Sequence, residues 1–77
     1  MNVTLSEFEY MKEGIVADVI SILMSEKKYS LAEAMNYVYN SNTFSLLSDP
    51  ETDLYIHSSR YIYNMLVIEI YRNTPFE

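Results

Sequence analysis

The sequence predicts an all-α protein: a compact bundle of three longer helices and one short helix, in a single domain that covers residues 1–77. Apolar residues recur at steps of three and four along most of the chain, which is the spacing of one helix face. Serine or threonine followed three residues later by glutamate marks the expected helix starts, as in a capping box. Glycine occurs only once, so the chain has little of the residue that tight β-hairpins favour.

The first helix is expected at about residues 7–27. Ser6 with Glu9 and Thr4 with Glu7 both match a capping box, so two registers are open for its start. The apolar residues at helical spacing are Phe8, Met11, Ile15, Val19, Ile22 and Leu23. A second stripe consists of the small residues Gly14, Ala17, Ser21 and Ser25. Small residues in line let another helix approach closely, either inside the chain or across a dimer, and both remain open.

The next two helices are expected at about residues 30–41 and 43–48. Ser30 and Glu33 form a further capping box. We expect this helix to end near Asn40 or Ser41, within the segment Asn40-Ser41-Asn42, because asparagine tolerates the left-handed conformation that ends many helices. The segment 43–48 is apolar and too short to be stable alone, so we expect it to lie on the core.

The connection to the last helix carries turn residues. Asp49 followed by Pro50 predicts a turn or a single helical turn, with Asp49 as its cap. Asp53 follows, and aspartate is among the few non-glycine residues that accept positive φ. Residues 54–56 are expected to form a short extended stretch without a partner strand.

The last helix is expected at about residues 59–72, capped by Ser58 or Ser59 and ended by residues 73–75. It has almost no polar face, and a helix that is apolar all round is buried on more than one side. In so small a domain, we expect one side to meet a second copy or another protein. The candidate interface residues are Tyr61, Ile62, Met65, Val67, Ile68 and Tyr71. Complete burial of residues 61–71 inside one chain would remove this expectation.

The composition also favours association. A chain of 77 residues buries only roughly 60% of the surface that its unfolded form exposes. Cysteine is absent, so disulfides and thiolate metal sites cannot add stability, and helix packing and a partner remain. The eight tyrosines suit a small core that reaches the surface, and they also suit interfaces. We expect most of them to be half-buried and one or two to contact another chain.

The charge argues against direct binding to nucleic acid. Eleven acidic residues face five basic ones, which gives a net charge of −6, and nucleic-acid binding relies on lysine and arginine to neutralise phosphates. Residues 30–41 and 43–48 have the outline of a helix-turn-helix, but the second segment has no basic residue. An acidic chain favours a basic partner instead.

The acidic residues do not form a convincing metal site. Asp49, Glu51 and Asp53 have the spacing of the first three ligands of a calcium loop, but the sixth position lacks glycine and the twelfth lacks glutamate. A solvated turn explains them better. Asp18 interrupts the first helix, and we expect it to face solvent, with a pair to Arg60 as the alternative.

His57 is the only histidine, and it is a weak catalytic candidate. A general base needs an orienting carboxylate and a nucleophile nearby, whereas Ser58 and Ser59 are better explained as helix caps. A small hydrolase or metal protein that uses His57 with Asp53 or Glu51 is therefore a minor alternative. We predict that the chain is not an enzyme and has no catalytic residues, metal or cofactor.

Part of the chain resembles a known group of proteins. Residues 29–34, 39–41, 47–55 and 58–63 are similar to small uncharacterised bacterial proteins with a YNS…LxDPxTGLYxQSPxYVY pattern. This family has no known activity and is found near other short genes, some of toxin–antitoxin type. Asp53 stands where the pattern has glycine and Ser59 where it has proline. The resemblance implies at most a small accessory or antitoxin-like protein.

No targeting or membrane segment is predicted. The first nine residues lack a basic region followed by an apolar stretch, so they do not match a signal peptide. The longest apolar run, residues 65–68, is far shorter than the roughly 20 residues of a membrane span. We therefore expect a cytoplasmic protein-interaction module that self-associates or docks on a partner protein, with no direct contact to nucleic acid or membrane. The alternative function is an acidic antitoxin-like or DNA-associated regulator.

Overall fold

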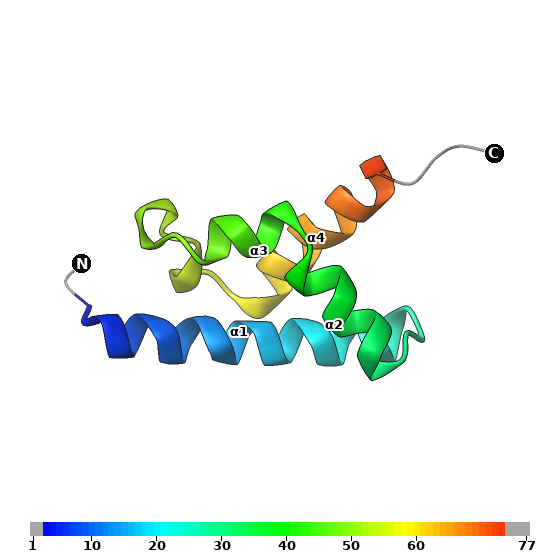
Figure 1. Cartoon of the computed structure of the whole chain (residues 1–77), viewed down its shortest axis with the longest axis horizontal. Coiled ribbons are helices and arrows are strands. Elements are labelled where there is room, and N and C mark those ends of the chain that lie inside the picture. Colours follow the sequence, from blue (N-terminus) through cyan, green and yellow to red (C-terminus); the bar gives the residue numbers. More distant parts are fainter. Residues whose placement is uncertain (1–2, 74–77) are drawn as a thin grey trace.

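The computed structural model describes residues 3–73, and every regular element in this part of the chain is a helix. The all-α prediction is confirmed. The α-helices are α1 (Leu5–Glu26), α2 (Leu31–Tyr39), α3 (Asn42–Leu47) and α4 (Ser59–Asn73), and two 3-10 turns, η1 (Pro50–Thr52) and η2 (Leu54–Ile56), lie between α3 and α4. Helix α1 runs along the long axis of the molecule, and α2 folds back from its C-terminal end. The elements α3, η1, η2 and α4 lie above α1 in the view of Figure 1.

Helix α1 begins at Leu5, two residues before the start that a Ser6 cap would give. Thr4 is the cap: its hydroxyl accepts a hydrogen bond from the Glu7 amide at 3.1 Å, and the Glu7 carboxylate accepts one from the Thr4 amide at 2.9 Å. This register puts Val3 against the core and buries Phe8, the pair of positions that often pack together across a helix start. With Ser6 as the cap, the two positions that pack together across the helix start would be Leu5 and Tyr10. These side chains are 75% and 80% exposed, so they could not serve.

Helices α2 and α3 begin with serine caps. The Ser30 capping box is present, with Ser30 accepting from the Glu33 amide and Glu33 accepting from the Ser30 amide. Helix α2 ends at Asn40 as expected, but Asn40 has φ −100°, not a left-handed conformation. Its side-chain amide instead donates to the Asn36 carbonyl at 2.9 Å. The Ser41 hydroxyl then accepts from the Phe44 amide and opens α3.

The connection between α3 and α4 matches the prediction from the sequence in its first half and differs from it in its second half. Asp49 caps η1 through the Glu51 amide, and Asp53 has φ 58°, as expected. Residues 54–56 are not extended, because Asp53 turns the chain into a second 3-10 turn, closed by a 3.0 Å hydrogen bond from the His57 amide to the Leu54 carbonyl. This turn directs Tyr55 into the core, where its ring meets Phe8 edge-on at 5.1 Å.

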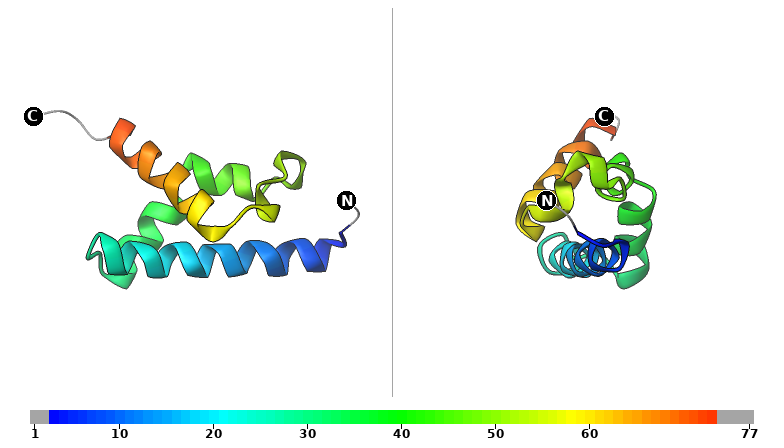
Figure 2. Two further views of the ribbon diagram at one scale, coloured as in Figure 1. Left: turned by 180° about the vertical axis from the view of Figure 1, so that it is seen from behind. Right: turned by 90° about the vertical axis from the view of Figure 1, so that its left-hand side faces the viewer.

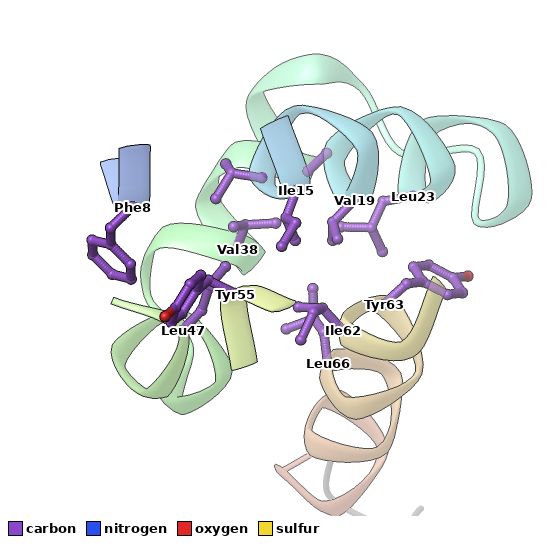
Figure 3. Close-up of a cluster of buried hydrophobic side chains, with 12 residues drawn as sticks. Phe8, Ile15, Val19, Leu23, Val38, Leu47, Tyr55, Ile62, Tyr63 and Leu66 are labelled. Carbon is purple, nitrogen blue, oxygen red and sulfur yellow. The ribbon is translucent and has the colours of Figure 1, made fainter. Parts of the chain in front are cut away.

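The core lies between α1 and the elements that cross it (Figures 2 and 3). Its side chains come from all four α-helices and η2, and each fully buried Leu or Ile adds about 1.5–3 kcal/mol. The buried apolar residues are Phe8, Ile15, Val16, Val19, Leu23, Ala34, Val38, Leu47, Tyr55, Ile62, Tyr63 and Leu66. Figure 3 shows Ile15 and Val19 of α1 directed toward Ile62 of α4. One apolar cluster therefore holds the first helix, α1, against the last helix, α4.

Helix α4 diverges from α1 toward its C-terminal end, which is visible in every view of Figures 1 and 2. The Ser58 hydroxyl accepts from the Tyr61 amide at 3.1 Å, so Ser58 provides the cap of α4. The expected stop after Asn73, at Thr74 and Pro75, lies outside the described residues. No helix within residues 3–73 has the length and apolar character needed to cross a bilayer.

Candidate interaction surface

The face of α4 that points away from the core carries large apolar side chains. Tyr61, Ile68 and Tyr71 are 47%, 53% and 68% exposed. Residues seven apart lie on one side of a helix, so Tyr61 and Ile68 are aligned, with Met65 between them. We call Tyr61, Ile68 and Tyr71, together with the partly buried Met65 at their edge, the outer stripe of α4. The opposite side of the helix enters the core through Ile62 and Leu66, which are only 2% and 1% exposed.

The structure divides the six candidate interface residues. Tyr61, Ile68 and Tyr71 are exposed, whereas Met65 and Val67 are partly buried against the core. Ile62 is a core residue, so it is not available to a partner. Within residues 3–73 the helix is buried on one side, and burial of another side by a second copy or a partner protein stays a prediction.

Neighbouring side chains hold both ends of the outer stripe. The His57 ring stacks on Tyr61, with ring centres 4.3 Å apart and planes inclined by 16°. At the other end, the Lys27 ammonium lies 5.2 Å from the centre of the Tyr71 ring, within range of a cation–π interaction. Exposed aromatic rings with restricted motion lose less entropy when a partner covers them.

Several basic side chains are already engaged inside the chain. Arg60 forms a 2.7 Å ion pair with Glu26, and the hydrogen bond from Arg60 holds the pKa of Glu26 below its ordinary value. Lys12 lies 3.3 Å from Glu9. Together with Lys27 over Tyr71, three of the five basic residues interact with neighbours. Lys12 and Arg60 therefore each lie beside a carboxylate, which a phosphate would have to displace.

The small-residue stripe of α1 is not used inside the described part of the chain. Gly14, Ala17, Ser21 and Ser25 are all exposed. Apart from its chain neighbours and the backbone of its own helix, a Cβ atom added to Gly14 would meet nothing within 4 Å. Of the two alternatives for this stripe, packing against a helix of the same chain is therefore excluded for residues 3–73.

A groove between α1 and η2 was not anticipated from the sequence. It has a volume of about 600 Å³ and is lined by Tyr10, Met11, Glu13, Gly14, Ile15, Asp18, Tyr55, Ile56, His57 and Ser59. The sequence held a partial signal, because Tyr10 falls on the polar side of the first helix. The other wall, which includes Tyr55 and Ile56, could not be predicted, because residues 54–56 were expected to be extended and form a 3-10 turn instead.

The acidic residues and His57 do not form a metal-binding cluster within residues 3–73. Asp49 serves as the cap of η1, and no three or more His, Asp or Glu side chains between residues 3 and 73 form a group that could hold a metal ion. Asp18 is exposed, as expected, and accepts a 2.6 Å hydrogen bond from the Ser59 hydroxyl. Arg60, the alternative partner of Asp18, pairs with Glu26.

Comparison with known proteins adds no assignment: no protein-family model, no curated protein and no solved structure matches this chain. The resemblance to the small bacterial proteins with the YNS…LxDPxTGLYxQSPxYVY pattern therefore stays a prediction. The function has to be argued from the surface itself.

Proposed function

We propose that this chain is a cytoplasmic protein-interaction module that self-associates or docks on a partner protein through the outer stripe of α4. The proposal rests on one observation: Tyr61, Ile68 and Tyr71 expose about half or more of their side chains along one side of a helix whose other side is in the core. Large apolar side chains that gather on one exposed side of a helix are typical of sites of association. The proposal assigns no catalysis, metal or cofactor to the chain.

The composition of the stripe supports a protein as the occupant. Two of its four residues are tyrosines, which are enriched in protein interfaces because each offers a large apolar ring and one hydroxyl. Covering an apolar surface contributes about 25 cal/mol per Å², which matters for a chain whose own core is small. Association through α4 would therefore add stability as well as specificity.

The alternative, an acidic antitoxin-like or DNA-associated regulator, gains less support. Lys12, Lys27 and Arg60 interact with neighbouring side chains. Direct DNA binding needs several lysine or arginine contacts to phosphate. An antitoxin-like role that acts by binding another protein would use the same outer stripe, and the experiment below applies to it as well.

Two variants with matched exposure test the proposal. Ile68 and Leu31 are 53% and 54% exposed, and both lie on helices, but only Ile68 belongs to the outer stripe. We expect I68E to weaken self-association or partner retention about tenfold or more, and L31E to leave it unchanged. Sedimentation velocity measures self-association, and tagged protein captured from host lysate at high salt measures partner retention. Equal behaviour of I68E, L31E and the natural chain would contradict the proposal.

A further inference from the structure

The groove between α1 and η2 adjoins the outer stripe at His57, and it combines apolar walls with acidic groups. Its floor contains Ile15 and Tyr55, which are buried at 7% and 5% exposure. Its edges carry Tyr10 and Ile56, which are 80% and 50% exposed. An apolar side chain of a partner placed here would therefore meet apolar residues of both α1 and η2.

The charge of the groove selects the chemistry of its occupant. Glu13 and Asp18 line it from α1. They are five residues apart, which is about 7.5 Å along a helix axis. Among the described side chains that line the groove there is no lysine or arginine. A segment with two basic side chains one to two turns apart would match these carboxylates, whereas an acidic segment would be repelled.

Gly14 lies between the two acidic residues and opens the groove to a partner's backbone. Glycine inside a helix costs about 1 kcal/mol relative to alanine, and this glycine is in the middle of α1, where a Cβ atom would meet nothing within 4 Å apart from its chain neighbours and the backbone of its own helix. The packing within residues 3–73 therefore gives no reason for a glycine here. Close approach of a second helix gives one, because two helices can come nearest where a side chain is missing.

We propose that this groove is a second docking site, which binds a basic amphipathic helix of a partner protein. The apolar face of that helix covers Tyr10 and Ile56, its backbone passes Gly14, and its lysine or arginine side chains pair with Glu13 and Asp18. The site adjoins the outer stripe of α4 at His57, which lines the groove and stacks on Tyr61. Gly14→Leu and I68E, one in the groove and one about two turns along α4 from Tyr61, therefore test the two proposals separately.

A synthetic helix tests the docking directly. The probe is a peptide of about 18 residues, or about five helical turns, with leucine on one face and lysine on the other, titrated into the ¹⁵N-labelled full-length chain. We expect NMR shift changes at the amides of residues 10–18 and 55–59. Gly14→Leu fills the groove while it improves helix propensity, so it should weaken binding about tenfold without loss of fold.

Matched controls separate the groove from other surfaces. Ser25→Leu adds the same side chain to the same stripe of α1 outside the groove, and it should leave binding unchanged. Glu13→Gln should weaken binding about threefold or more, whereas Glu51→Gln, an exposed acid outside the groove, should not. The same peptide with glutamate in place of lysine should not bind.

Three results would overturn the proposal. In the first, Gly14→Leu binds the lysine peptide as tightly as the natural chain does. In the second, the shift changes fall on residues 61–71 and are removed by I68E, which would move the site to the outer stripe. In the third, spermidine alone shifts the same amides as strongly as the peptide, which would make a small polycation the ligand.

Discussion

Glu69 on α4 and Thr43 on α3 are joined by two hydrogen bonds. One carboxylate oxygen of Glu69, Oε1, accepts from the Thr43 amide at 2.8 Å and from the Thr43 hydroxyl at 2.7 Å. The other oxygen accepts from the Asn42 amide at 2.7 Å. The Ser41 hydroxyl accepts a hydrogen bond from the Phe44 amide, so the first three amides of α3 all have acceptors. A residue of the last helix therefore completes the start of a helix that is too short to be stable alone.

Replacing Glu69 by alanine should destabilise the protein. The change leaves the amides of Asn42 and Thr43 without their acceptor and removes a negative charge from a helix N-terminus. We expect a loss of about 1–2 kcal/mol in the free energy of unfolding, the range for a helix cap. Urea denaturation followed by circular dichroism measures it, with Glu51→Ala as an exposed control. An unchanged midpoint would show that α3 does not depend on Glu69.

The same carboxylate makes stability depend on pH. Partial burial acts to raise the pKa of Glu69, but the hydrogen bonds from Asn42 and Thr43 outweigh it and hold the pKa below the ordinary 4.5. The unfolded state therefore binds the proton first as the pH falls. The stabilisation is complete above pH 4.5 and is lost as the pH falls through the lower value of the folded state.

Glu69→Gln should therefore flatten part of the acid-side loss of stability. Glu7 also contributes in the same direction, because hydrogen bonding from the Thr4 amide lowers its pKa, and this contribution stays in the variant. Unfolding free energies measured in urea between about pH 3 and 7 give the two slopes. Parallel curves for the variant and the natural chain would contradict the role assigned to Glu69.

The cap of α2 is a second, local source of stability. Ser30→Ala removes the acceptor of the Glu33 amide and should cost about 1 kcal/mol. Ser45→Ala, at an exposed position inside α3, is the control, and alanine's higher helix propensity makes it neutral or slightly stabilising. Thermal unfolding of the two variants distinguishes the effects. Equal melting temperatures would indicate that the capping box contributes nothing measurable.

Gly14→Ala should stabilise the chain by about 1 kcal/mol, because the new methyl group has open space around it. Differential scanning calorimetry of the isolated protein measures the shift. Destabilisation would mean that the glycine has a structural role inside the chain, and it would remove the main steric argument for the groove as a docking site.

The helix starts illustrate what the sequence can and cannot predict. Ser30 with Glu33 defines one start, because a cap is a contact between residues three apart. The start of α1 was ambiguous, since Thr4 and Ser6 both fit the local pattern. The choice depends on Phe8 reaching Tyr55, and no local pattern contains a contact between two residues so far apart in the chain.

The orientation of α4 could not be derived from the sequence, for a similar reason. Tyr61, Ile68 and Tyr71 are exposed, and the interface that the apolar composition indicated stays a prediction. Ile62 was misplaced because every side of the helix is apolar, so the sequence could not show which side meets α1. The groove beside Gly14 was missed because it depends on the 3-10 turn after Asp53, where an extended stretch was expected.

Photo-crosslinking in the native host tests most directly whether a protein covers the outer stripe of α4. A photoreactive phenylalanine analogue is placed at Ile68, at Tyr71 or, as a control of equal exposure to Ile68, at Leu31. We predict a discrete crosslinked species from the first two positions, either a dimer of the chain or an adduct with one partner, and none from Leu31. Crosslinks that are absent from Ile68 and Tyr71, or identical from all three positions, would contradict the proposed interface.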